Sequence, residues 1–333
     1  MFPYGSMNDD DFRLCWSLSN LRPLESTRNQ SEGDRLGLFP GFHRFSEIRG
    51  AVLSKLQSHA CDETPSHIFN KLQSVRLGES CPGSTVGLKY LDSIFTNRFR
   101  ASTQGHSSLM SSLDDSELLL RVVAHIVRSG DVVTPASVLK NLKFVVRAPG
   151  HFFPASAHAI WAKYSIPGLP VFDPCLGWGG RSLGAMTANV ARLVGCDVQA
   201  EVVTNCRVVA DGFSSVSSTV AEFHHTDSLQ FLRDSSEVFG MVFTSPPYMD
   251  TENYGVESDA MRQSWIDDFV FPIAREFRRH LAPDGKVALH LKDLKGAPTF
   301  TAYHSAMMAA GFKQVARHKY GRTWTQAVYV YGL

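Results

Sequence analysis

The chain has 333 residues, of which 44% are hydrophobic and 20% charged, and its formal net charge at pH 7 is +1. This length allows one large domain and a smaller one, and this composition is ordinary for a folded globular protein. The balance of charge predicts no basic surface over the chain as a whole, so contact with nucleic acid would depend on local patches. We find neither an apolar run of bilayer length nor a charged-then-apolar leader, and we expect no membrane association.

Six cysteines are scattered along the sequence, and none forms a Cys-x-x-Cys pair. Their spacing favours reduced thiols in an intracellular protein over a disulfide framework or a zinc site. The adjacent His224 and His225 could suggest a metal, but neighbouring side chains on a strand point to opposite faces. We therefore interpret both histidines as structural and predict no metal ligands.

The N-terminal part of the sequence changes character near residue 41. Residues 1–40 are polar and carry few periodic apolar positions, which is typical of a tail. Residues 41–147 have apolar side chains at three- and four-residue spacing, which predicts a helical region. Within this region, Ser112 and Asp115 resemble a capping box at the start of a helix.

One segment of the helical region, residues 89–100, interleaves basic and aromatic side chains. Lys89 is followed by Phe95, Arg98 and Phe99. Such a pattern is found on surfaces that bind nucleic acid by stacking and charge. It is equally typical of an amphipathic helix whose aromatic side is buried and whose basic side is solvated. The sequence leaves both interpretations open.

From residue 148 to residue 333 the pattern alternates between strands and helices, which predicts an α/β domain with a parallel sheet wound on both faces. We expect strands at 171–172, 192–197, 241–243 and 287–291, helices around 158–161, 269–281 and 301–310, and a turn at 282–285. Only a short stretch joins the last two predicted strands, 312–320 and 327–331. They must therefore pair antiparallel, because a parallel pair needs a long crossover.

A glycine-rich loop follows the first of these strands, with the sequence Asp173-Pro174-Cys175-Leu176-Gly177-Trp178-Gly179-Gly180. Glycines at the start of a helix let the backbone come close to a ligand. The loop does not match the dinucleotide-binding pattern, because Ser182 stands where a third glycine or alanine is expected. Pyrophosphate binding, and with it a nicotinamide-dependent enzyme, is therefore disfavoured.

Three acidic residues stand at the ends of successive predicted strands. Asp197 follows the glycines by about twenty residues, the spacing at which a Rossmann-like unit places an acid on a ribose. Asp173 suits a ligand with a positive amino group, such as the methionyl end of S-adenosylmethionine, and Asp227 would contact the adenine amine. Each acid alone is more often a turn or cap residue. We expect Asp173 and Asp197 to lie at strand ends, outside the core.

The strand at 241–243 ends in Thr244-Ser245-Pro246-Pro247-Tyr248. Two prolines cannot continue a strand's hydrogen-bonded ladder, so the chain must leave the sheet here. The exit presents the Ser245 hydroxyl, the Pro246 carbonyl and the Tyr248 ring at a strand's carboxyl end, where open α/β sheets bind ligands. A planar base with an exocyclic amine fits such a corner, since the two oxygens accept hydrogen bonds and the ring stacks.

With these motifs in view, the chain from about Phe152 to Leu333 resembles the S-adenosylmethionine-dependent amino methyltransferases of DNA, which make N4-methylcytosine and N6-methyladenine. The resemblance implies a class I methyltransferase fold: a Rossmann-like doubly wound sheet with a C-terminal antiparallel strand pair, here preceded by a mostly helical region. Phe153-Pro154 is similar to the motif that precedes the family's first strand. Gly177 to Arg181 departs from the more common Phe-x-Gly-x-Gly form of the cofactor loop.

The resemblance also implies the site residues. Those expected to bind the cofactor S-adenosylmethionine are Phe153, Pro154, Asp173, Pro174, Cys175, Gly177, Trp178, Gly179, Asp197, Asp227, Ser228 and Thr244. Those expected to carry catalysis are Ser245, Pro246, Pro247 and Tyr248. Serine at the first position of the catalytic motif is usual in the cytosine N4 branch, whereas adenine enzymes usually have Asp or Asn there.

We therefore expect a cytosine-N4-specific DNA methyltransferase that is located with DNA inside the cell and flips its target base out of the duplex. Recognition of DNA would fall to residues 41–147 or to the loop after Tyr248, where residues 249–255 resemble a mobile flap. One alternative is N6-adenine methylation of DNA or RNA. Another is a non-catalytic DNA-binding or regulatory protein on the same scaffold. The sequence does not decide between a monomer and a homodimer.

Overall fold

The structure is a computed structural model that describes residues 45–57, 62–103, 105–246, 252–253, 265–292, 299–321 and 325–333. The chain divides into two compact units. Unit 1 contains the described residues of Met1–Ala60 and Phe99–Pro149, and unit 2 those of Cys61–Arg98 and Gly150–Leu333. The α/β domain was predicted to start at residue 148, close to Gly150, where the second segment of unit 2 begins. Residues 62–98, which we expected in the helical region, belong instead to unit 2, which contains the sheet. The predicted tail, residues 1–40, lies outside the described residues.

Unit 1 is built mainly from helices around one apolar core. Its helices are α3 (Phe45–Gln57), α6 (Leu109–Ser112), α7 (Ser116–Arg128) and α8 (Pro135–Val145), and it includes the short strand β1 (Ser102–Thr103). Ile48 and Val52 of α3 pack with Val123 of α7 and with Val138 and Leu142 of α8. Over the described residues, the mostly helical N-terminal region is therefore confirmed.

The predicted capping box at the start of α7 is wrong in one residue. Asp115 is the N-cap, and its carboxylate accepts a hydrogen bond from the Leu118 amide at 2.9 Å. Ser112 instead ends α6, where its hydroxyl donates to the Leu109 carbonyl. A carboxylate beside the first turn satisfies an amide that the helix leaves unpaired, so no serine is needed upstream.

Unit 2 contains a seven-stranded sheet in the order β4-β3-β2-β5-β7-β9-β8. The strands are β2 (Pro170–Asp173), β3 (Arg192–Asp197), β4 (Val220–His225), β5 (Phe239–Thr244), β7 (Leu281–Lys292), β8 (Lys313–Lys319) and β9 (Gln326–Gly332). The first five strands in the order are parallel, and β9 is antiparallel to both β7 and β8. This arrangement confirms the class I methyltransferase fold and the C-terminal antiparallel pair.

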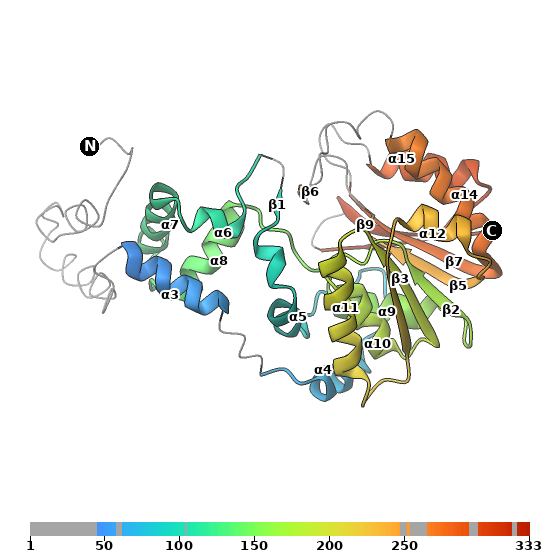
Figure 1. Ribbon diagram of the computed structural model, residues 1–333, viewed down its shortest axis with the longest axis horizontal. Helices are drawn as coiled ribbons and strands as arrows, with labels where there is room; N and C mark the ends of the chain where they lie inside the picture. The colour runs from blue at the N-terminus through green and yellow to red at the C-terminus, as the bar shows by residue number, and fades with distance from the viewer. Residues whose placement is uncertain are drawn as a thin grey trace, which may run out of the picture. The chain divides into compact units, whose positions relative to one another are not determined.

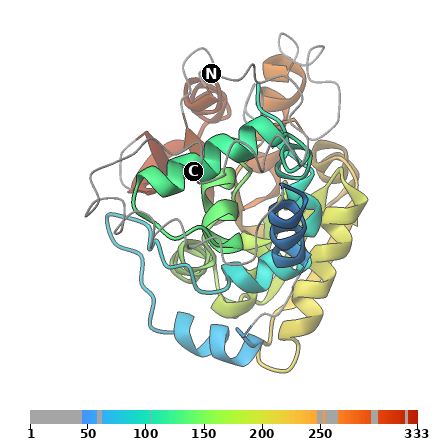
Figure 2. The same cartoon turned by 90° about the vertical axis from the view of Figure 1, so that its left-hand side faces the viewer.

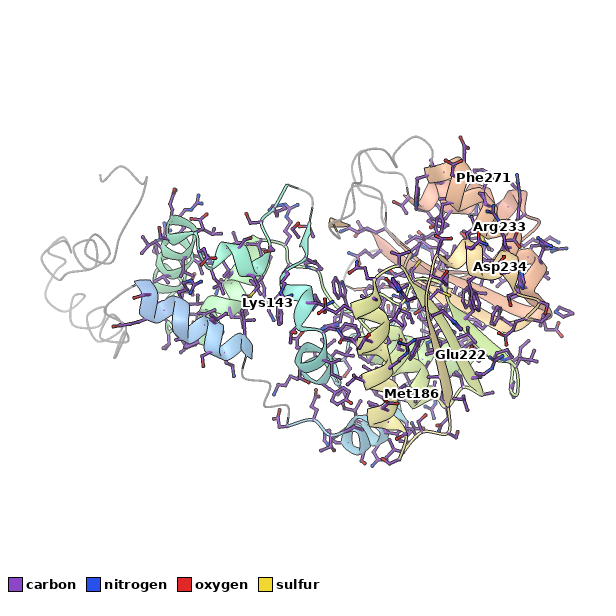
Figure 3. The ribbon with its side chains drawn as sticks, viewed as in Figure 1. Lys143, Met186, Glu222, Arg233, Asp234 and Phe271 are labelled. Atoms are coloured by element: carbon purple, nitrogen blue, oxygen red, sulfur yellow. The ribbon has the colours of Figure 1, made fainter. Side chains whose placement is uncertain are left out.

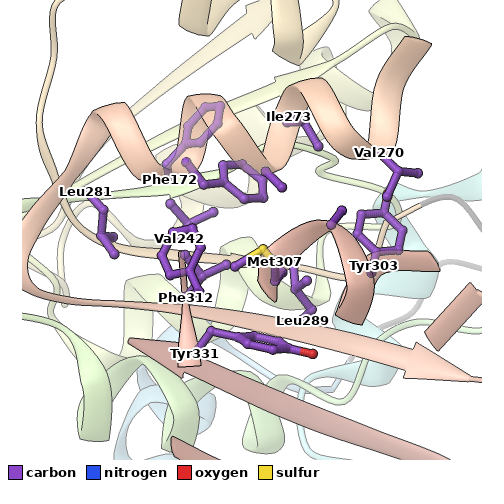
Figure 4. Close-up of a cluster of buried hydrophobic side chains, with 14 of the residues drawn as sticks. Phe172, Val242, Val270, Ile273, Leu281, Leu289, Tyr303, Met307, Phe312 and Tyr331 are labelled. Carbon is purple, nitrogen blue, oxygen red and sulfur yellow. The ribbon is translucent and has the colours of Figure 1, made fainter. Parts of the chain in front are cut away.

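Helices cover both faces of this sheet (Figure 1). One face carries α9 (Pro154–Tyr164), α10 (Gly180–Ala188) and α11 (Ala200–Phe213), and the other carries α12 (Ser228–Asp234), α14 (Phe271–His280) and α15 (Thr299–Ala309). The π-helical turn η3 (Ile266–Val270) leads into α14. Figure 4 shows the apolar cluster under the second set of helices, where Phe172, Val242 and Leu289 of the sheet meet Ile273 and Met307.

The predicted turn at 282–285 does not separate helix α14 from a strand. It lies inside β7, which begins at Leu281. Leu281 pairs with Phe239, and the next pair joins Lys286 to Met241, so β7 bulges between them. A Cβ at Gly285 would lie 2.6 Å from the Leu281 side chain, so the bulge needs glycine at this position.

Residues 62–98 add a further layer to unit 2. The helices α4 (Pro65–Leu72) and α5 (Leu88–Ile94) both pack against α11, and Figures 1 and 2 show α4 in light blue beside the yellow α11. A Cβ at Gly212 of α11 would lie 2.1 Å from the Tyr90 hydroxyl. The glycine therefore permits the close approach of α5.

The segment that mixes bases with aromatics is largely buried. Phe95 has no exposed surface, and Phe99, which ends the 3₁₀ helix η2 (Thr96–Phe99), is 5% exposed. Arg98 is 4% exposed and forms an ion pair with Asp92. These aromatic rings belong to the cores of the two units, which supports the interpretation as an amphipathic packing segment rather than a nucleic-acid surface.

The edge strand β4 is polar. Glu222, labelled in Figure 3, forms an ion pair with Arg192 of the neighbouring β3 at 2.9 Å. Charged side chains at an edge discourage pairing with a second sheet.

None of the helices in the described part of the chain has the length and apolar character needed to span a bilayer.

Candidate active site

The candidate site lies at the carboxyl ends of the central strands. β2 pairs with β3 on one side and with β5 on the other, so the direction of winding reverses between β2 and β5. Open α/β sheets bind their ligands at such a switch point. Asp173 ends β2 and Thr244 ends β5, with exposed fractions of 0% and 1%. The glycine loop and Ser245 follow these two residues directly.

Two glycines of the loop have left-handed backbones, with φ of 58° at Gly177 and 75° at Gly179. A Cβ at Gly179 would lie 2.4 Å from the Phe95 ring, and one at Gly180 would lie 2.0 Å from the Phe152 carbonyl oxygen. Glycine is therefore required at 179 and 180 by packing within the protein. Gly177 is less crowded, since the nearest atom to a Cβ at this position would be Arg181 Nη2 at 3.8 Å.

Asp173 lies inside the core, which corrects our expectation that it stands outside. Its Oδ2 lies 3.0 Å from Arg181 Nε, and its Oδ1 accepts from Arg181 Nη2 and from the Cys175 amide, both at 3.3 Å. Burial raises the pKa of Asp173, and the charge of Arg181 lowers it. Arg181 also donates to the Cys175 carbonyl. Both carboxylate oxygens thus hold the start of the glycine loop. The first residue of the loop, Pro174, is buried.

Asp197 links the end of β3 to the same loop. Its Oδ2 accepts a hydrogen bond from the Gly177 amide at 3.1 Å, and its Oδ1 accepts one from the Gln199 amide at 3.0 Å. Burial raises the pKa of Asp197, whereas these two amides lower it. The residue is only partly buried, so its carboxylate lies at the border between the loop and the solvent.

Asp227 lies two residues after β4, which ends at His225, and is the N-cap of α12. Its carboxylate accepts from the Gln230 amide at 2.9 Å, and the side chain is exposed, whereas Ser228 is 4% exposed. A cap accounts for this acid without a ligand. A carboxylate has a second oxygen, which could accept from a ligand at this edge of the sheet.

A chain of polar contacts that local sequence patterns do not show fixes the other side of the loop. The Trp178 carbonyl lies 2.8 Å from His151 Nδ1, and His151 Nε2 lies 2.8 Å from Asp92 Oδ1. Asp92 in turn forms the ion pair with Arg98. The loop is thereby anchored to residues 88–98, which belong to unit 2.

The Phe153-Pro154 motif opens α9 at the N-cap and first helical positions. The Phe153 amide donates to the Tyr320 hydroxyl at 3.0 Å, and the two ring centroids lie 5.7 Å apart. Phe152 packs against Tyr320 with 4.7 Å between centroids. Burial raises the pKa of Tyr320 well above its usual range. The motif thus lies in an aromatic cluster beside β7 and β8.

Ser245 contacts a residue that the sequence did not identify. Its Oγ lies 3.0 Å from Nδ1 of His290, on the neighbouring strand β7. Burial lowers the pKa of His290 to about 3, and Arg181 and Lys292 add to the decrease. Pro246 is described and buried. Pro247, Tyr248 and the predicted flap, apart from the backbone of β6 (Glu252–Asn253), lie outside the described residues.

The described cysteines, Cys81, Cys175, Cys196 and Cys206, are free thiols. In the described part of the chain, no group of three or more His, Cys, Asp and Glu side chains is placed to hold a metal ion. His224 lies 2.9 Å from Glu222, and His225 lies 3.0 Å from the Val198 carbonyl. Both histidines thus have contacts within the sheet and its loops.

No protein-family model matches the chain, and no curated protein matches its sequence. Three solved structures illustrate the structural matches. TrmN from Thermus thermophilus matches with a TM-score of 0.39 and 20% identity over 54% of this chain and 48% of that one. A ribosomal protein L11 methylase from Lactobacillus delbrueckii subsp. bulgaricus has a TM-score of 0.39 and 13% identity, over 54% and 78%. A TehB-like SAM-dependent methyltransferase from Corynebacterium glutamicum has a TM-score of 0.37 and 11% identity, over 60% and 99%.

The match thus spans about half the length of the TrmN structure. These scores and identities are too low to assign a family or a substrate. The fold class follows instead from the strand order and from the antiparallel β9 of this chain's own sheet.

Proposed function

We propose that this chain is an S-adenosylmethionine-dependent methyltransferase that acts on an exocyclic amine of a nucleic-acid base, namely N4 of cytosine in DNA. The observation that carries the proposal is the position of Ser245. It directly follows β5 at the switch point of the sheet, next to the end of β2, where the glycine loop begins. A methyl donor over the loop and an acceptor at Ser245 would therefore share one edge of the sheet.

The loop fits a nucleoside better than a pyrophosphate. The partly buried carboxylate of Asp197, beside Gly177, suits a pair of ribose hydroxyls, which donate hydrogen bonds to it. Asp227 would accept from the adenine amine. Asp173 has a different role from the one first expected, because Arg181 engages its carboxylate: we propose that it holds the loop in shape for the cofactor. When bound, S-adenosylmethionine supplies a methyl group on a positively charged sulfur.

The rest of the proposed cofactor site follows the same edge. Phe153, Pro154, Pro174, Cys175, Trp178, Gly179, Ser228 and Thr244 would complete it. Most of these side chains are buried, and the packing of Gly179 against Phe95 shapes the backbone that a ligand would meet. The proposed site thus depends on the loop's backbone more than on exposed polar side chains.

The proposed chemistry needs an acceptor more than a strong base. The lone pair of an aromatic amine is spread into its ring, which makes the nitrogen a poor nucleophile. Hydrogen bonds from the amine to Ser245 Oγ and to the Pro246 carbonyl favour a pyramidal nitrogen with a localised pair. Stacking on Tyr248 would offset part of the cost of flipping the base, which is a few kcal/mol.

The proposal is tested by incubating DNA with the protein and S-adenosylmethionine that carries a deuterated methyl group. Mass spectrometry of the released nucleosides should detect labelled N4-methylcytosine. Labelled N6-methyladenine alone, from DNA or from RNA, would overturn the choice of base and keep the reaction class. Binding of S-adenosylmethionine without any product would favour a regulatory protein on this scaffold, and absence of binding would overturn the proposal as a whole.

A further inference from the structure

The contact between Ser245 and His290 follows from the pairing of their strands. β5 and β7 run parallel, and Thr244 pairs with Leu289. Ser245 and His290 are the next residues along the chain, and their side chains approach to 3.0 Å between Oγ and Nδ1. The sheet therefore fixes the distance between the two groups, and no loop needs to move to bring them together.

His290 is enclosed by aromatic rings, and the Gln326 side chain forms a hydrogen bond with it. It is 6% exposed, and its ring centroid lies 5.2 Å from that of Phe152 and 4.4 Å from that of Tyr320. Such surroundings disfavour a charged imidazole. A neutral imidazole has one nitrogen that donates and one that accepts, so the hydrogen bond to Ser245 has a definite direction.

We propose that His290 is a positioning residue that accepts the Ser245 proton at Nδ1 and thereby turns the serine oxygen into an acceptor for the target amine. The inference rests on the proposed function, since it assumes that an amine approaches Ser245. A hydroxyl carries a single proton. Once that proton points to His290, the serine oxygen can only accept hydrogen bonds from other groups. An amine, which donates through its N–H groups, requires such an acceptor.

The opposite direction would work against the reaction. If Nδ1 carried the proton, it would donate to Ser245 Oγ, and the hydroxyl proton would be turned toward other groups, the amine among them. Two donors facing one another repel. An imidazolium would have the same effect and would add a positive charge where the amine becomes more positive. The enclosure by Phe152 and Tyr320 thus disfavours the imidazolium form.

Variants of His290 separate this role from a structural one. Asparagine can place its oxygen near the position of Nδ1, whereas glutamine reaches toward that of Nε2. Partners that orient the ligands of a metal typically contribute about 10- to 100-fold to activity, and we expect an effect of similar size for a group that orients Ser245. We expect His290→Gln to lower kcat by about that factor with an unchanged KM for DNA and unchanged S-adenosylmethionine affinity. His290→Asn should recover most of the lost kcat. In a Ser245→Ala background, His290→Gln should cause little further loss, because the two residues act together.

Nitrogen-15 NMR of the histidine rings tests the direction of the hydrogen bond without any turnover. In the wild-type protein, Nδ1 of His290 should have the shift of an unprotonated nitrogen, and Ser245→Ala should move that shift. A protonated Nδ1 would overturn the inference even if the protein methylates DNA. Equal losses of kcat in the Asn and Gln variants, both folded, would overturn it as well. If no methyl transfer is found with wild-type protein, the proposed function fails, while the NMR result still decides the direction of the Ser245–His290 bond.

Discussion

Asp173 and Arg181 form an ion pair inside unit 2, with side chains that are 0% and 5% exposed. The pair joins the end of β2 to the first turn of α10 across the glycine loop. Removing one partner of a buried pair leaves the other charge without compensation, which costs about 3–5 kcal/mol. The loop that shapes the candidate cofactor site therefore depends on this pair for its stability.

We predict that Asp173→Ala lowers the free energy of unfolding by about 3–5 kcal/mol, measured by urea denaturation. Asp173→Ala combined with Arg181→Met should be less destabilised than the single variant, because no uncompensated charge remains. Asp227→Ala is a matched control, since it removes an exposed N-cap at a cost of about 1 kcal/mol. An Asp173→Ala protein as stable as wild type would show that the pair does not hold the loop.

Asp197 gives a prediction about affinity rather than folding. In Asp197→Asn, the side chain keeps one accepting oxygen but loses its charge, and one of its two amide contacts must change. Charged hydrogen bonds contribute about 1.5–3 kcal/mol, so we expect S-adenosylmethionine to bind roughly 10- to 100-fold more weakly in calorimetric titration. Asp211→Asn, an exposed change on α11, should bind as wild type does. Unchanged affinity in Asp197→Asn would remove this residue from the cofactor site.

His290 makes a prediction about pH. Its pKa is lowered from the ordinary histidine value of 6.5 to about 3 in the folded protein, so below pH 6.5 the unfolded chain binds a proton that the folded protein does not. Its contribution is therefore present above pH 6.5 and is lost as the pH falls toward 3, by an amount on the order of 5 kcal/mol.

Burial also lowers the pKa of His158, to about 4, which acts in the same direction. The comparison of wild type with His290→Asn isolates the effect of His290. The free energy of unfolding should fall more steeply in the wild type than in His290→Asn between pH 6.5 and pH 5. Parallel curves for the two proteins would mean that His290 titrates normally.

Unit 1 gives a prediction about DNA. Residues 132–149 include Lys140, Lys143 and Arg147 and no acidic residue, and Phe144 beside them is 84% exposed. If this region binds DNA, Lys140→Glu with Arg147→Glu should weaken DNA binding and reduce its salt dependence by about two phosphate contacts, with unchanged cofactor affinity. Arg233→Glu on α12, labelled in Figure 3, is a control in unit 2.

Fluorescence anisotropy with labelled duplex DNA at several salt concentrations measures both quantities. Equal affinity and equal salt slope in the double variant would favour recognition by the loop after Tyr248. Deletion of all residues before Phe152 is a poorer test than substitution. It would also remove His151 and Phe95, which contact the glycine loop, and Asp92, which contacts His151.

Local patterns in the sequence predicted the sheet well. The strand expected at 192–197 is the observed β3, Arg192–Asp197. The apolar run and the acidic residue that ends it both lie within this segment, so the strand could be recognised without knowledge of distant contacts. The antiparallel end of the sheet followed from the short link between the last two strands. Two other local predictions were less accurate, because Asp115 alone caps α7 and the turn expected at 282–285 lies inside β7.

The contacts within the site could not be predicted in the same way. His151 lies 59 residues from Asp92 in the sequence, and Ser245 lies 45 residues from His290. Neither pair has a spacing that a motif would reveal, because the fold alone brings each pair together. The glycine-rich pattern could be recognised in the sequence. Gly179 is needed because a side chain there would collide with the Phe95 ring, and the sequence had placed Phe95 in the helical region rather than beside the loop.

The central claim is that the corner at Ser245 activates an amine for methyl transfer. Single-turnover methyl transfer by Ser245→Ala protein, saturated with S-adenosylmethionine and DNA, tests it most directly. Because the hydrogen bond to the amine would act in the transition state, we expect a rate roughly 10²-fold or more below wild type, with cofactor and DNA affinity unchanged. A folded Ser245→Ala protein that transfers the methyl group at the wild-type rate would contradict the claim.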